Sequence, residues 1–153
     1  MKYFLLLASV LVLSCSGCVK DEKGCSNVKP EDEQAQIMAY AAANGITATR
    51  HSSGLYYQVV NPGAGATPTI NSRVTVTYTG KFLNNTQFDQ STTPISFNLN
   101  QVIEGWIVGI PLIQKGGKIK MIVPSALAYG CNGAQTIPGN AVLFFDVDLI
   151  DVQ

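Results

Sequence analysis

The sequence predicts an α+β fold in which a twisted antiparallel β-sheet wraps around one short α-helix. Several segments alternate apolar and polar residues with the period of two that is typical of half-buried strands. One segment, residues 100–110, instead has its apolar residues at the helical spacing i, i+3, i+4 and i+7, namely Ile103, Trp106, Ile107 and Ile110. Because strands with one apolar face need a cover, we expect this helix to pack on the sheet.

The predicted strands follow one another between residues 54 and 153. In RVTVTYTGKF, the side chains of Val74, Val76 and Tyr78 share one face and threonines share the other. The segments GLYYQVV, ISFNL, KIKMIV and VLFFDVDLIDV also read as strands, the last three with the same alternation. Proline, glycine and asparagine in NPGAGATPTINS predict a turn after the first strand.

The predicted helix has an unusual composition, because Gly105 directly precedes the only tryptophan, Trp106, and Gly109 follows it. Each glycine destabilises a helix by about 0.5–1 kcal/mol relative to alanine. The helix therefore depends on tertiary packing, and its small residues would let it lie close to another surface. Pro111 removes a backbone donor, so the helix is either very short or kinked there.

Charge and composition exclude several classes of function. Ten basic residues balance ten acidic residues without forming a basic cluster, which argues against nucleic-acid binding. The single histidine, His51, has no cysteine or carboxylate cluster near it in the sequence, so we expect no metal site. Small neutral ligands and peptides remain as binding partners.

The amino-terminal residues are typical of a secretory signal. Lys2 precedes the apolar run YFLLLASVLVL, which is too short and too early for a membrane-spanning helix. The residues before Cys15 resemble the lipobox of bacterial lipoproteins, in which the cysteine is lipidated and becomes the amino terminus. Cys18 is the alternative lipid site, and an ordinary signal peptide is the alternative to a lipobox. We favour Cys15 because Val12 supplies the apolar residue three positions upstream.

These features divide the chain into four parts: a lipoprotein signal peptide at residues 1–14, a lipid anchor and flexible tether at 15–33, a short helix and linker at 34–53, and the main domain at 54–153. Lipidation would anchor an exported protein in the cell envelope, by our expectation at the outer membrane, without spanning the bilayer. It would leave Cys18, Cys25 and Cys131, of which one pair can form a disulfide.

Five segments, taken in order, resemble the FK506-binding-protein (FKBP) family of peptidyl-prolyl cis-trans isomerases: VTVTYTGKF, FDQS, NQVIEGW, GGKIKMIVPSALAYG and IPGNAVLFFDVDL. The resemblance covers residues 54–153. In that family a twisted antiparallel sheet wraps a short helix, and the helix tryptophan forms the floor of an apolar pocket for a proline ring. The resemblance implies an enzyme that accelerates rotation of X-Pro bonds in exported proteins and that uses no cofactor.

The resemblance also implies a set of site residues. The backbone N–H of Ile103 and the hydroxyl of Tyr129 would bind substrate carbonyl oxygens, while Asp89 would lie beside the rotating amide and accept a hydrogen bond from Tyr78. Asp89 is alternatively a structural carboxylate that only orders Tyr78. The implied substrate-binding residues are Phe88, Phe97, Val102, Trp106, Ile137 and Phe145.

The sequence departs from the family pattern in two segments. Ile95 stands where a further pocket aromatic is often found, in a segment that is shorter than in many relatives, and Thr136 replaces an apolar residue of some relatives. Both departures bear on pocket depth and peptide preference.

The expected partners are proline-containing segments of folding envelope proteins, FK506-like macrolides and, through the lipid, the membrane. A proline-binding or chaperone module with little catalytic activity is the alternative function. We expect a monomer, because the helix predicted at 34–44 is much shorter than the dimer-forming helices of some exported relatives.

We predict that the mature protein begins with a lipidated Cys15, because the apolar run ends immediately before it and Ser14 is a small residue suited to cleavage. Mass spectrometry of the mature amino terminus checks this. An unmodified terminus at Ser16 or beyond, or a lipid on Cys18, would contradict the prediction.

Overall fold

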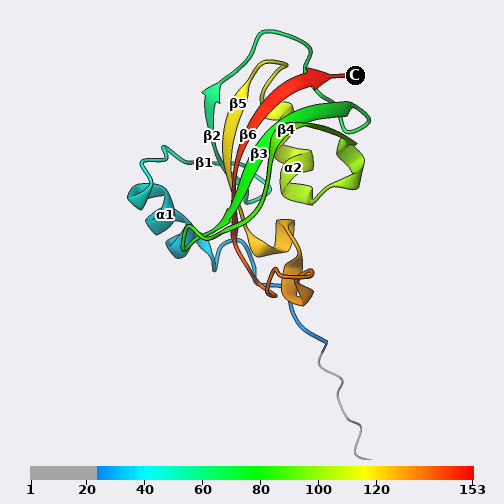
Figure 1. The fold of residues 1–153 in the computed structure, drawn as a ribbon. Helices are drawn as coiled ribbons and strands as arrows, with labels where there is room; N and C mark the ends of the chain where they lie inside the picture. Colours follow the sequence, from blue (N-terminus) through cyan, green and yellow to red (C-terminus); the bar gives the residue numbers. More distant parts are fainter. Residues whose placement is uncertain (1–23) are drawn as a thin grey trace, which may run out of the picture.

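The computed structural model describes residues 24–153, so the predicted signal peptide, Cys15 and Cys18 lie outside the described residues. Six strands form one sheet in the order β1-β2-β5-β6-β3-β4, and every neighbouring pair is antiparallel (Figure 1). The strands are β1 (Thr49–Arg50), β2 (Tyr56–Asn61), β3 (Arg73–Phe82), β4 (Gln87–Asn98), β5 (Lys118–Val123) and β6 (Leu143–Val152). The predicted α+β class is confirmed.

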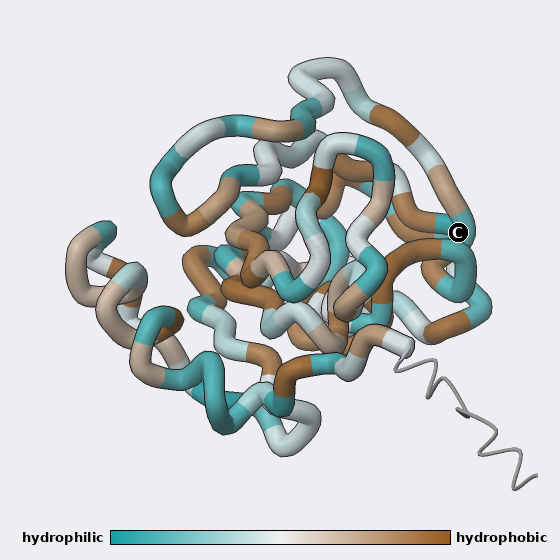
Figure 2. The backbone as a smooth tube through the Cα atoms, turned by 90° about the horizontal axis from the view of Figure 1, so that it is seen from below, coloured by the Kyte–Doolittle hydropathy of each residue, from teal (hydrophilic) through white to brown (hydrophobic). Residues whose placement is uncertain are grey.

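One face of the sheet forms the main core. The alternation predicted for β3, β5 and β6 is present, since residues at every second position have almost no exposed surface: Val74, Val76, Ile119, Met121, Val123, Leu143, Phe145, Val147 and Leu149. In the hydropathy colouring, hydrophobic segments run through the middle of the molecule, and others lie at its edge (Figure 2). A sheet with this apolar face needs a covering element.

Helix α2 (Glu104–Gly109) covers that face and lies very close to it. A Cβ atom on Gly105 would overlap the side chain of Val123, and one on Gly109 would overlap the sulfur of Met121. The two glycines therefore set the distance between helix and sheet. The buried residues of the helix are Gly105, Trp106 and Gly109, whereas Ile107 is only half-buried, so the glycines take part of the buried stripe that the isoleucines were expected to form.

Helix α2 is short, as Pro111 predicts. After six residues it passes into the 3-10 turn η2 (Ile110–Leu112), which contains the proline near its start. A second 3-10 turn, η1 (Leu99–Gln101), precedes the helix and connects it to β4. The connection from β4 to β5 therefore consists of η1, α2 and η2.

The opposite face of the sheet carries the amino-terminal helix α1 (Gln34–Ala43), which lies close to the predicted range (Figure 1). Ile37, Tyr40 and Ala41 of α1 belong to a second buried cluster, whose sheet residues are Tyr56, Ile122 and Phe144. Ile122 lies between Met121 and Val123, which face α2, so β5 is buried on both faces. Among residues 24–153, no helix is long and apolar enough to cross a bilayer.

Composition predicts a flexible tether for residues 15–33, but the described part of this segment, residues 24–33, makes specific contacts with the domain. Cys25 forms a disulfide with Cys131, and Glu33 is only 2% exposed. Pro30 packs against Gly54, where an added Cβ would lie 2.7 Å from the proline Cβ. The composition of a segment indicates how well water solvates it, but it does not indicate which distant residues the segment contacts. The contacts of Cys25, Pro30 and Glu33 could therefore not be predicted from composition. The expected boundary of the main domain at residue 54 stays a prediction, and these contacts argue that the preceding residues stabilise it.

We predict that Gly105→Ala destabilises the fold by about 1–2 kcal/mol, because the methyl group meets the β-branched side chain of Val123 and the overlap outweighs the gain in helix propensity. Gly24→Ala is the matched control, since an added Cβ there meets nothing within 4 Å. Urea unfolding of both variants checks this. An unchanged midpoint for Gly105→Ala would show that helix and sheet separate easily.

Candidate active site

A cavity of about 410 Å³ opens between α2 and the curled sheet. Its walls come from β3, β4, the η1–α2 segment, the loop after η3 (Ser125–Leu127) and β6. The lining residues are Tyr78, Asp89, Ile95, Phe97, Gln101, Val102, Ile103, Trp106, Tyr129 and Phe145. The fold therefore brings together all of the expected site residues except Phe88 and Ile137.

Trp106 forms the buried base of this cavity and is 5% exposed. The rings of Tyr78 and Phe145 meet its indole edge-on, with centroids 5.2 and 5.3 Å away, and Phe97 lies tilted at 5.5 Å. Edge-to-face contacts at these distances are favourable. The indole is thus fixed by three aromatic neighbours from three different strands, and the remaining space is a rigid apolar pocket.

Asp89 is held in one orientation beside that pocket. Its Oδ2 accepts a hydrogen bond from the Tyr78 hydroxyl at 2.6 Å, and its Oδ1 accepts from the Gln90 N–H at 2.8 Å. The hydroxyl–carboxylate distance is that of a charge-assisted hydrogen bond. The carboxylate is nevertheless exposed to solvent at the cavity rim. The expected contact between Tyr78 and Asp89 is therefore present.

The two tyrosine hydroxyls at the site are held in the protonated state. Burial, followed by the hydrogen bond to Asp89 and by the negative charge of that residue, raises the pKa of Tyr78. Burial and the same carboxylate charge raise the pKa of Tyr129. Both groups consequently remain hydrogen-bond donors throughout the neutral and mildly alkaline range.

The backbone N–H of Ile103 and the hydroxyl of Tyr129 belong to residues that line the same cavity. Ile103 is the N-cap residue of α2, and its carbonyl accepts from the Trp106 N–H at 3.0 Å, so its own N–H precedes the helix and has no intrahelical partner. Tyr129 follows η3 and is 38% exposed. Both residues line the cavity, so the Ile103 N–H and the Tyr129 hydroxyl are candidate donors to a bound ligand.

Phe88 and Ile137 line a neighbouring cavity of about 300 Å³, which shares Asp89 and Tyr129 with the first. The ring of Phe88 packs on Phe82 and Phe145, with centroids 5.0 and 5.7 Å away. Phe88 therefore packs against Phe145, which lines the main cavity, and helps to hold that ring in place. The expected contact of Phe88 and Ile137 with a bound proline peptide stays a prediction, since their cavity adjoins the one based on Trp106.

The structure also adds residues that were not among the expected site residues. Gln101 lines the main cavity, and its Oε1 accepts a hydrogen bond from the Asn98 amide at 3.1 Å. Gln101 lies in the motif NQVIEGW, but it was not among the pocket residues that the family resemblance implies. Ile95 lines the cavity and is 44% exposed, at the position where the sequence lacks a family aromatic. Within residues 24–153, no group of three His, Cys, Asp or Glu residues is arranged to hold a metal ion.

Comparison with known proteins agrees with the geometry of the site. A family model described as "FKBP-type peptidyl-prolyl cis-trans isomerase" matches residues 65–150. A crystal structure of a peptidyl-prolyl cis-trans isomerase from Pseudomonas syringae superposes with a TM-score of 0.70 at 31% identity, covering 84% of this chain and 98% of that one. The chain belongs to the FKBP-type peptidyl-prolyl cis-trans isomerase family.

Among particular relatives, the chain is similar to FkpA proteins. It is 43% identical over 136 residues to FkpA of Aeromonas hydrophila, covering 87% of this chain and 49% of the relative. The crystal structure of FkpA from Escherichia coli superposes with a TM-score of 0.72 at 39% identity, covering 80% of this chain and 60% of that one. The chain thus spans about half the length of the curated relatives it matches.

We predict that catalytic efficiency toward a proline peptide is constant between about pH 7 and pH 9, because raised pKa values keep Tyr78 and Tyr129 protonated there. The same shifts stabilise the fold below pH 10, the ordinary tyrosine pKa, and this stabilisation decreases as the pH rises toward the folded-state values. A pH series of kcat/KM and of the unfolding midpoint checks both statements. A fall in kcat/KM with a midpoint below about pH 9 would contradict the assignment.

Proposed function

We propose that this protein is a peptidyl-prolyl cis-trans isomerase that accelerates X-Pro bond rotation in exported proteins. The observation that carries the proposal is the aromatic pocket based on Trp106, with Asp89 and two protonated tyrosines on its rim. Membership of the isomerase family supports the same activity.

The reaction places few chemical demands on the protein, since no covalent bond breaks when an X-Pro amide rotates. The barrier of about 18–20 kcal/mol arises from amide resonance, which planarity maintains. Water stabilises the planar, more polar amide better than the twisted one. A pocket of Trp106, Phe97 and Phe145 excludes water from the proline ring and thereby lowers the free energy of the twisted state relative to the planar state.

The rim groups orient the peptide on either side of that ring. In this proposal the N–H of Ile103 and the hydroxyl of Tyr129, both residues of the cavity lining, donate to substrate carbonyl oxygens. Asp89 presents a carboxylate beside the rotating amide, ordered by the Tyr78 hydroxyl and the Gln90 N–H. Holding both ends of the peptide while the central bond turns is catalysis by orientation.

We also propose that the protein is a lipid-anchored monomer of the bacterial cell envelope, held at the outer membrane through Cys15, with folding envelope proteins as its substrates. The apolar run and lipobox-like residues support this. Cys25 lies ten positions after Cys15, and an extended chain of ten residue steps reaches about 33–36 Å at most. Since Cys25 is bonded to Cys131, two residues beyond Tyr129, the pocket would work close to the bilayer surface.

The direct experiment is a protease-free isomerisation assay on a set of X-Pro peptides, with and without FK506. The proposed function requires acceleration over the uncatalysed rate and inhibition by the macrolide. A protein that binds the peptides without accelerating their isomerisation is instead a proline-binding or chaperone module.

We predict that Asp89→Asn lowers kcat about ten-fold while FK506 affinity and stability change little, because it keeps the shape of the side chain and removes its charge beside the rotating amide. Trp106→Ala should instead lower affinity and stability together, by about 3–5 kcal/mol for stability. Kinetics and FK506 titration at matched folded fraction check this. Full activity in Asp89→Asn would reduce Asp89 to a structural carboxylate that orders Tyr78.

A further inference from the structure

We propose that residues 25–33, here called the N-terminal strap, position Tyr129 for the isomerase reaction, and that the Cys25–Cys131 disulfide is the contact that closes the strap. The inference rests on the proposed function, in which the Tyr129 hydroxyl binds a substrate carbonyl. It assigns a role to residues far from Tyr129 in the sequence and outside the pocket.

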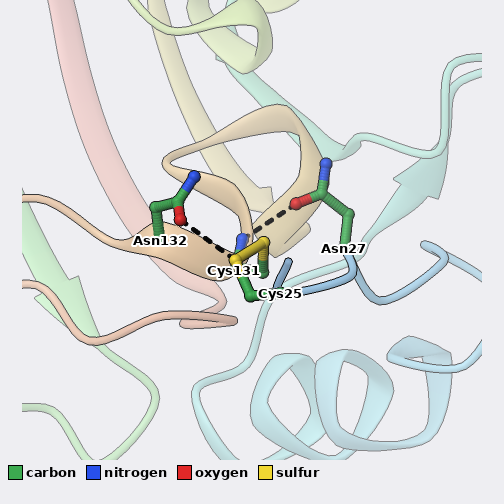
Figure 3. The surroundings of a disulfide bond; sticks show 4 residues. All are labelled: Cys25, Asn27, Cys131 and Asn132. Carbon is green, nitrogen blue, oxygen red and sulfur yellow. Dashed lines mark hydrogen bonds between the residues drawn. A yellow bond between two sulfur atoms is a disulfide. The ribbon is translucent and has the colours of Figure 1, made fainter. Parts of the chain in front are cut away.

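The first group of contacts lies just after Tyr129. The disulfide joins residues 106 positions apart and brings Cys25 onto the turn η4 (Gly130–Asn132), as Figure 3 shows. The Asn27 Oδ1 accepts a hydrogen bond from the Cys131 N–H at 2.8 Å (Figure 3). The Cys25 sulfur also lies 3.0 Å from the Asn132 Oδ1, a close contact in which a disulfide sulfur has no proton to donate. A covalent bond and a hydrogen bond thus fix the same turn.

The backbone beside Tyr129 is shaped to receive the strap. Gly130 has a φ of +58°, and a Cβ added there would lie 2.6 Å from the Asn27 Oδ1. Only glycine accommodates both the positive φ and the close approach of the amide. The Gly130 carbonyl in turn accepts from the Asn140 N–H at 2.8 Å, which connects the fixed turn to the rest of the loop.

A second contact lies before Tyr129. The Glu33 Oε2 accepts a hydrogen bond from the N–H of Ser125, the first residue of η3, at 2.8 Å in a buried environment. Hydrogen bonds to a carboxylate are stronger than neutral ones, and breaking this one would leave a buried donor unpaired. Glu33 and the disulfide therefore hold the chain four residues before Tyr129 and two residues after it.

Tyr129 needs such support because it lies between two 3-10 turns and not within a helix or strand. Tyr78, Phe97 and Phe145 contact the Trp106 ring, whereas Tyr129 is not among its ring contacts. Its hydroxyl position consequently depends on the backbone of its loop, and a misplacement of about 1 Å is enough to reduce catalysis strongly. The disulfide is accessible to reductant, since Cys25 is exposed.

The test is a cycle of reduction and substitution in the full-length mature protein. We expect reduction to lower kcat/KM for a proline tetrapeptide about three- to ten-fold at matched folded fraction. In Tyr129→Phe, reduction should change kcat/KM less than about two-fold, because the hydroxyl through which the strap acts is absent. The double variant Cys25→Ser/Cys131→Ser is the control and should not respond to reductant. No loss in the wild type, or an equal loss in Tyr129→Phe, would overturn the proposal.

Substitutions of Asn27 test the same proposal without reducing the disulfide. Asn27→Asp keeps an oxygen acceptor for the Cys131 N–H, whereas Asn27→Leu removes it at similar size. We expect kcat/KM to fall in Asn27→Leu and to stay within about two-fold of wild type in Asn27→Asp. Equal activities in the two variants would count against a positioning role.

Amide hydrogen exchange separates this proposal from the proposed function. Reduction should accelerate exchange at the Gly133 and Asn140 amides, whose acceptors are the carbonyls of Tyr129 and Gly130, and leave the Met121 amide in the central strand β5 unchanged. This readout does not require catalysis. A protein without isomerase activity but with this exchange response would refute the proposed function and leave the strap as a support of the Tyr129 loop, whereas an unchanged exchange pattern would refute the strap itself.

Discussion

The close approach of α2 to the sheet is the constraint on which the rest of the structure depends. Gly105 and Gly109 place the helix backbone against Val123 and Met121, at a distance where an added Cβ would overlap these side chains. At that distance Trp106, between the two glycines, reaches the rings of three strands and becomes the base of the cavity. A helix that propensity disfavours is therefore stabilised by the same packing that builds the pocket.

One face of the sheet packs against α2 and the other packs against α1, and β5 and β6 contribute buried residues to both faces. Met121 and Phe145 belong to the core under α2, whereas Ile122 and Phe144, one residue later and one earlier, pack with α1. Burial on both faces makes the central strands a rigid support for the aromatic wall. The charged and polar rim, with Asp89 and Tyr129, lies on more exposed segments. A buried base and an accessible rim suit the proposed binding of peptide segments.

The N-terminal strap connects the rim of the cavity with the part of the chain that would lead to the proposed lipid anchor. Its contacts are a disulfide, a hydrogen bond from a backbone amide and a buried carboxylate, each with a partner about a hundred residues away. If the anchor is at Cys15, the same disulfide that supports the Tyr129 loop also shortens the path from membrane to pocket. The Cys25–Cys131 disulfide would then affect both the position of the Tyr129 loop and the distance of the pocket from the bilayer.

Local pattern determined most of the elements, and the family resemblance implied most of the site. Period-two alternation located β3, β5 and β6, and helical spacing with Pro111 predicted a short α2, because each signal depends only on neighbours in the chain. The ordered motifs of the family resemblance gave Tyr78, Asp89, Trp106 and Tyr129 of the cavity. Only the tertiary structure showed that Phe88 and Ile137 line a neighbouring cavity and that Gln101 lines the main one. It also showed that Cys25 is the disulfide partner of Cys131 and that Glu33 is buried. These features depend on which distant segments meet, and neither composition nor periodicity records that.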